Sequence, residues 1–123
     1  MANRHYIKLS HNEPVVKIYS TESAGEIVDV ALSDLAIPDE TFDANTAIVT
    51  IKEIFWGAKK DKQIDLTRWD GVESHGHYYL LGSGYYTYTG FVDNLYSNSD
   101  IRVDIDGPGH VLLKLTKEAG YTI

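Results

Sequence analysis

Two histidines lie two residues apart in the segment SHGHYYLLGSGYYTYTG, which spans residues 74–90. On a β-strand, residues at this spacing point to the same face, so His75 and His77 can present two imidazoles to one metal ion. His110 is a candidate for a distant third ligand, and Glu73 is a candidate acidic ligand. A zinc or iron site of this kind supports catalysis, because it keeps one coordination position open.

The histidine pattern is incomplete as a metal site. Double-stranded β-helix metalloproteins place an acidic ligand a few residues after their histidine pair, but residues 78–81 read Tyr-Tyr-Leu-Leu. Gly76 between the two histidines also indicates a turn instead of a regular strand. We therefore expect no metal and no cofactor, and we interpret these histidines as turn or hairpin residues.

The same segment holds five of the nine tyrosines of the chain. Tyrosine combines a large rigid ring with a polar tip, so such residues can pack across strands, contact another protein or stack on sugars. We predict a contact surface for another protein. Its candidate residues are Trp56, Trp69, Tyr78, Tyr79, Tyr85, Tyr86 and Tyr88. If the ligand were a glycan, Trp56, Trp69 and Tyr86 would be the first to test.

Other catalytic patterns are absent from the sequence. Gly82-Ser83-Gly84 is too short for the Gly-x-Ser-x-Gly elbow of serine hydrolases. Asp104 and Asp106 alternate with apolar residues and are predicted to face solvent; a calcium site there is the less favoured alternative. The chain has no cysteine, which excludes thiolate ligands and nucleophiles. We expect that the protein is not an enzyme.

The elements that must position these side chains are β-strands. Alternation places Ile64 and Leu66 inward in QIDLTRW, and it gives DIRVDID an apolar face that includes Ile101. Two hairpins are predicted: one turns at Gly82-Ser83-Gly84, and the other joins DIRVDID to HVLLKLT. NTAIVTIKEIFW is apolar on both faces, which predicts a central strand or a phase shift at a bulge.

Residues 1–123 therefore predict one all-β domain, a single-domain antiparallel β-sandwich or partly closed barrel of about eight short strands. The formal net charge of −7 argues against a nucleic-acid partner. No apolar run approaches the roughly 20 residues that span a bilayer, so we expect no membrane partner. The first residues contain no secretory signal, which predicts synthesis in a cytoplasm.

Several short motifs resemble small virion structural proteins of tailed phages that infect marine cyanobacteria. They include MANRHYIKLS, EPVVKIY, IDLTRWDG and DNLYSNSDIRVDIDGPGHVLLKLTKEAGY. The residues that match the pattern are Arg68, Asp93, Asn94, Ser99, Asp100, Ile101, Gly107, Leu113, Leu115, Lys117, Gly120 and Tyr121. Residues 73–90 depart from it most, because they are richer in His and Tyr.

This resemblance implies a virion protein that is made in the host cytoplasm. The function expected first is capsid decoration, in which the chain binds the major capsid protein and stabilises the shell as an oligomer or as part of a lattice. A neck or tail component of the virion, with other virion proteins as partners, is the alternative. A carbohydrate-binding module for host attachment is the alternative from another class.

Overall fold

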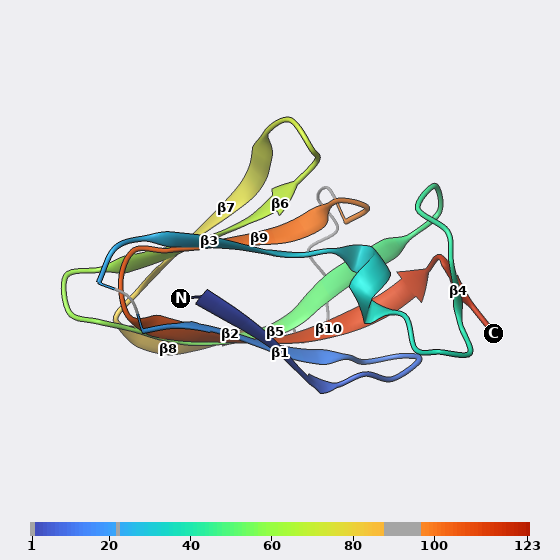
Figure 1. Cartoon of the computed structure of the whole chain (residues 1–123), viewed down its shortest axis with the longest axis horizontal. Helices are drawn as coiled ribbons and strands as arrows, with labels where there is room; N and C mark the ends of the chain where they lie inside the picture. Colours follow the sequence, from blue (N-terminus) through green and yellow to red (C-terminus); the bar gives the residue numbers. More distant parts are fainter. Residues whose placement is uncertain (1, 22, 88–96) are drawn as a thin grey trace.

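The computed structural model describes residues 2–21, 23–87 and 97–123, which form antiparallel β-sheets packed together. Figure 1 shows two main layers, one above the other, with a short two-stranded ribbon at one end. The predicted all-β class is confirmed. Among the described residues, no helix has the length and apolar character needed to cross a membrane.

The first sheet has the strand order β1-β2-β10-β5-β8, and the second has the order β3-β9-β6-β7. Strands of the first sheet are β1 (Ala2–Lys8), β2 (Val15–Ser20), β10 (Gly109–Ala119), β5 (Ile48–Ala58) and β8 (Ser83–Thr87). Strands of the second are β3 (Glu26–Val30), β9 (Asp100–Ile105), β6 (Gln63–Trp69) and β7 (Ser74–Leu81). The ribbon pairs β4 (Thr41–Phe42) with β11 (Tyr121–Thr122), and a short 3-10 helix, η1, covers Leu32–Leu35.

The hydrophobic core lies between the two main sheets. It is built by alternation, because each strand directs every second side chain inward. Ile64 and Leu66 are fully buried, as predicted, and Ile101 is as well. The opposite parity of these strands carries polar side chains, including Asp104, which is exposed as predicted.

Strand β5 changes phase in its middle. Its pairing with β10 shifts register between Ile51 and Glu53, so the strand contains the predicted bulge and also lies between β10 and β8. Ile51 and Ile54 are both buried although they are three residues apart. Phe55, which shares the parity of Ile51 in a regular strand, is therefore turned outward and is 38% exposed.

Both predicted hairpins are wrong in their pairing. The turn at Gly82 joins two strands as expected, but β7 pairs with β6 and β8 pairs with β5, in the other sheet. The turn at Gly107 likewise connects β9 in the second sheet to β10 in the first. Gly82 (φ +63°) and Gly107 (φ +119°) allow the chain to cross between the sheets, and each strand then pairs with a neighbour that is distant in sequence.

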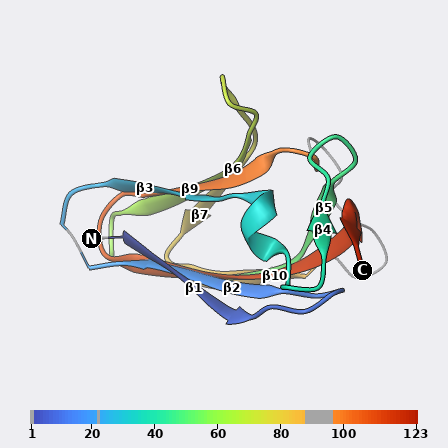
Figure 2. The ribbon, with the colours of Figure 1, turned by 45° about the vertical axis from the view of Figure 1, so that its right-hand side comes forward.

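The β6–β7 hairpin is one of the few local pairings. Figures 1 and 2 show that its end rises away from the remaining strands of the second sheet. The tip consists of residues 70–73, between Trp69 and Ser74. Val72 at this tip is 84% exposed. The hairpin therefore presents its turn as a projecting feature of the molecule.

Candidate functional site

The three histidines singled out in the sequence lie in three separate environments. His75 Nε2 is 2.8 Å from Asp70 Oδ2 at the hairpin tip. His77 Nδ1 is 3.1 Å from Asp65 Oδ2 further along the hairpin. His110 belongs to β10 in the other sheet. The structure thus does not bring His75, His77 and His110 together, and a metal centre built from all three is excluded by this arrangement.

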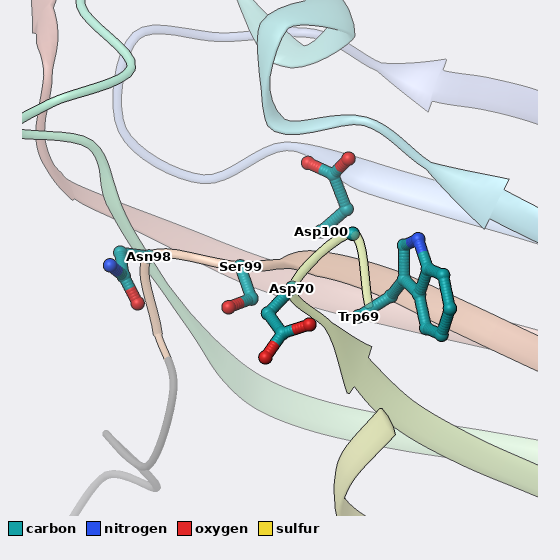
Figure 3. A pocket seen from close by; sticks show the side chains of 6 residues that line it. Trp69, Asp70, Asn98, Ser99 and Asp100 are labelled. Atoms are coloured by element: carbon teal, nitrogen blue, oxygen red, sulfur yellow. The ribbon is translucent and has the colours of Figure 1, made fainter. Parts of the chain in front are cut away.

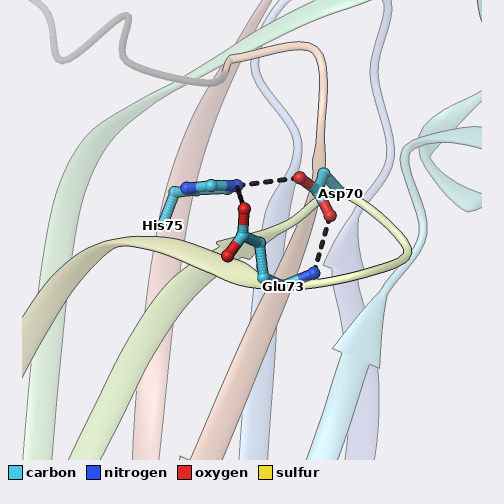
Figure 4. Close-up of side chains that lie close together, drawn as sticks. All are labelled: Asp70, Glu73 and His75. Atoms are coloured by element: carbon cyan, nitrogen blue, oxygen red, sulfur yellow. Dashed lines mark hydrogen bonds and ion pairs between the residues drawn. The ribbon is translucent and has the colours of Figure 1, made fainter.

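A different group forms around His75. Asp70, Glu73 and His75 are the one set of three metal-ligating side chains in the described residues whose ligand atoms all lie within 4.8 Å of one another. Figure 4 shows the His75 imidazole directed at both carboxylates. The distance from His75 Nε2 to Glu73 Oε1 is 3.9 Å. This group is called the hairpin-tip triad below.

The turn that carries the triad is fixed by Asp70. Its Oδ1 accepts hydrogen bonds of 2.8 Å from the backbone N–H groups of Val72 and Glu73. The Glu73 N–H, then His75 and the Val72 N–H lower the pKa of Asp70 to about 2. Asp70 is therefore ionised at any physiological pH, and its second oxygen faces the imidazole.

A polar cavity of about 320 Å³ lies beside the tip of this hairpin (Figure 3). Its lining residues are Trp69, Asp70, Gly71, Asn98, Ser99 and Asp100. In Figure 3 the Asp70 and Asp100 carboxylates point away from each other. Asp100 Oδ1 also accepts a 3.0 Å hydrogen bond from the backbone N–H of Leu32. The two carboxylates therefore serve the fold and do not form an acid–base pair.

A second cavity, of about 250 Å³, lies on the outer face of the second sheet and is lined by Gln63, Asp65, Asp104 and Asp106. Asp65 and Asp104 stand directly opposite each other on β6 and β9. Partial burial, and then the charges of Asp65 and Asp106, raise the pKa of Asp104. This arrangement makes an acidic depression, and His77 contacts one of its carboxylates.

The predicted contact residues are divided among several places. In the second sheet, the Arg102 Cζ lies 3.6 Å from the centroid of the Trp69 ring. The Tyr79 ring stacks on the His77 imidazole. A separate cluster joins the sheets where β5, β7 and β8 meet. There Tyr86 contacts Trp56 and Tyr78, with ring centroids 5.1 and 6.3 Å apart. Tyr88 lies outside the described residues, as do Asp93 and Asn94 of the resemblance.

Tyr85 belongs to another surface, the outer face of the first sheet. It stands opposite Phe55, which stands opposite Leu112 on β10. The Phe55 and Tyr85 rings stack with centroids 5.7 Å apart at 22°. Tyr19 and His110 form the neighbouring cross-strand pair. The five residues Tyr19, Phe55, Tyr85, His110 and Leu112 are called the aromatic face below.

The predicted contact residues do not include Tyr19, Phe55 or Leu112. Strand alternation in VVKIYS, with buried Val16 and Ile18, was a sufficient signal for Tyr19. Phe55 gave no such signal, because only the bulge in β5 turns its ring outward. The aromatic face forms only because strands that are distant in sequence pair side by side, and the local sequence does not specify that pairing.

Comparison of this chain with protein-family models, with curated proteins and with solved structures finds no match.

Proposed function

We propose that this chain is a non-enzymatic virion structural protein of a tailed phage, which decorates the capsid by binding the major capsid protein. The observation that carries the proposal is the aromatic face. Tyr85 is 66% exposed, Phe55 is 38% exposed and Tyr19 is 36% exposed, all on one side of the first sheet. Contiguous exposed aromatic residues of this kind mark protein-binding surfaces, because burying them against a partner releases water from a large apolar area.

The charges around the aromatic face indicate the kind of partner surface. Lys17 stands in the same cross-strand row as Leu112, and Lys114 lies one row away, where Glu53 on β5 stands opposite it. The outer face of the second sheet, in contrast, carries the acidic depression. A partner for the aromatic face is therefore expected to offer an apolar centre with an acidic group facing Lys17.

Two further observations support a virion protein. The motif resemblance extends through strands β1, β2 and β10 of the first sheet and β6 and β9 of the second, which are three of five and two of four strands. The net charge of −7 suits the outer surface of a shell better than an interior filled with DNA. A decoration protein also needs no catalytic group, and its function depends on a rigid surface.

Replacing Tyr85 by serine is expected to weaken binding to purified, expanded capsid shells by about 30-fold, which corresponds to a hot-spot loss of about 2 kcal/mol. Phe55→Ser is expected to act similarly, because its ring supports that of Tyr85. Sedimentation of labelled protein with the shells measures the affinity. Thermal unfolding of each variant checks that the fold is retained.

Tyr79→Ser is the matched control, since Tyr79 is 60% exposed but lies on the second sheet. It is expected to bind shells like the wild type. If the wild type does not bind shells but binds isolated neck or tail complexes, the result would indicate a neck or tail component instead of a decoration protein. Binding to none of these particles would reject the proposal.

A carbohydrate-binding function is the second candidate, favoured by the near-parallel rings of Phe55 and Tyr85. Exposed aromatic rings can stack on the flat faces of sugars. A glycan array probed with the wild type and Tyr85→Ser separates the two functions. Saturable glycan binding that Tyr85→Ser removes, without binding to capsid shells, would favour this second candidate.

A further inference from the structure

We propose that the hairpin-tip triad, Asp70, Glu73 and His75, is a binding site for a divalent transition-metal ion of the zinc type. The site is independent of the aromatic face, because it lies at the projecting end of the second sheet. It provides one imidazole nitrogen and two carboxylate oxygens, and solvent can supply the remaining coordination position at this exposed tip.

The two distances from His75 Nε2 to the carboxylate oxygens are close to those around such an ion, and the Asp70 and Glu73 oxygens lie within 4.8 Å of each other. Zinc bonds of about 2.0–2.1 Å to nitrogen and oxygen place tetrahedral ligands about 3.4 Å apart. The observed distances from His75 Nε2, 2.8 Å to Asp70 and 3.9 Å to Glu73, lie on either side of that value. Movements of about 0.5 Å bring both carboxylate oxygens to the required separation from His75 Nε2. The Glu73 side chain is 71% exposed and can move freely by this amount.

The backbone of the hairpin holds the ligands near each other before an ion binds. Asp70 Oδ1 is occupied by the two N–H groups of the turn, and this leaves Oδ2 directed at His75. The Asp70 N–H donates to the Glu73 carbonyl over 3.2 Å, which closes the turn. The His75 side chain is only 17% exposed. Asp70 and His75 therefore lose little conformational entropy when the ion is captured, whereas the exposed Glu73 side chain has to be ordered.

The donor set selects among metals. Calcium takes six to eight oxygen ligands and magnesium requires an octahedral set of oxygens, so a triad with an imidazole suits neither ion. Zinc, cobalt and nickel accept imidazole and carboxylate together. His77 and Asp65, on the same hairpin, form a pair with a similar contact, but within the part of the chain that the structure describes they belong to no such three-ligand group. This pair serves as an internal reference.

Titration of the wild-type chain with zinc chloride, followed by calorimetry in a buffer that does not chelate metals, is expected to show one saturable site per chain. His75→Ala is expected to weaken this binding at least about tenfold. Glu73→Gln keeps the side-chain shape and leaves the turn intact, and it is also expected to weaken zinc binding. His77→Ala is the matched control and is expected to bind zinc like the wild type.

Two further measurements make the result specific to the triad. The ¹⁵N resonance of the His75 imidazole is expected to shift on zinc addition, whereas that of His77 stays in place. Excess calcium is expected to leave zinc binding unchanged. The proposal is overturned if the wild type shows no saturable zinc binding, or if His75→Ala and Glu73→Gln bind zinc as tightly as the wild type. Displacement of zinc by calcium would also overturn it, because it would indicate attraction to carboxylates in general.

Discussion

Replacing Lys117 by methionine is expected to lower the free energy of unfolding by about 3–5 kcal/mol, because the buried Glu40 carboxylate loses its ammonium partner and keeps the contacts with the His11 ring and the Ile37 N–H. The two side chains are 1% and 0% exposed, and Lys117 Nζ lies 2.5 Å from Glu40 Oε1. The ammonium also donates to the carbonyl oxygens of Ser10 and Leu35, over 2.8 and 2.9 Å. One side chain thus fastens two loops to β10.

A double-mutant cycle tests whether the loss comes from the unpaired charge. Glu40→Gln leaves the ammonium buried without its counter-charge and is also expected to destabilise the chain by about 3–5 kcal/mol. Lys117→Met combined with Glu40→Gln removes both charges and is expected to be more stable than either charge-removing single variant. Urea unfolding at 25 °C gives the four free energies. A loss below about 1 kcal/mol in Lys117→Met would show that the pair does not hold the loops.

The same pair predicts a pH dependence. Burial raises the pKa of Glu40, but hydrogen bonds from Lys117, the Ile37 N–H and His11 outweigh it, so the pKa lies below the ordinary value of 4.5. A depressed folded-state pKa gives stability that is fully present above the unfolded-state value and is lost as the pH falls through the folded-state value. The stability difference between the wild type and Glu40→Gln is therefore expected to be constant near pH 7 and to shrink only below about pH 4.5.

Replacing Arg68 by leucine is expected to destabilise the chain by at least about 3 kcal/mol, because each buried carbonyl that loses its donor costs about 1–3 kcal/mol. Arg68 is 4% exposed. Its guanidinium donates to Val49 O over 2.9 Å, to Ser97 O over 2.9 Å, and twice to Ser99 O, over 2.7 and 3.1 Å. Ser97 O also accepts from the Val49 N–H, so the loss is expected mainly at Val49 O and Ser99 O. The side chain therefore links β6 to β5 in the other sheet and to residues 97–99.

Two variants separate this role from a general effect of charge. Arg68→Lys keeps a cation but lacks the planar fork of donors, so it is expected to restore less than half of the lost stability. Arg102→Leu removes an arginine at the surface that pairs with Asp29 and covers Trp69. It is expected to cost less than about 2 kcal/mol. Equal losses in Arg68→Leu and Arg102→Leu would contradict the assignment of a structural role to the buried guanidinium.

The alternation of apolar and polar residues in the sequence is enough to assign almost all inward-facing and outward-facing side chains of the strands. Ile64 and Leu66 share a parity with Arg68, and Leu115 shares one with Lys117. The pattern therefore also marks both charged residues as inward, and each is buried because a set of oxygen acceptors surrounds it. The pattern does not identify those acceptors, since they come from segments that are distant in sequence, including β5 and η1.

Strand pairing and the candidate sites were harder to predict. Turn residues such as Gly82 show where the chain reverses, but they do not show whether the next strand joins the same sheet or the opposite one. The aromatic face follows from the pairing of β2, β10, β5 and β8, so it could not be assembled from local patterns. The hairpin-tip triad is local, yet Asp70 joins it only through the geometry of the turn.

The position of β10 has a consequence for synthesis of the chain. This strand pairs with β2 on one side and with β5 on the other, so the first sheet is in two parts until residues 109–119 are present. Local hairpins such as β6–β7 can form early, but the sheet must wait for contacts between the two ends of the chain. The first sheet of a nascent chain is therefore expected to stay incomplete on the ribosome until β10 emerges, and a prematurely terminated chain is expected to leave the edges of β2 and β5 that face β10 without their partner strand.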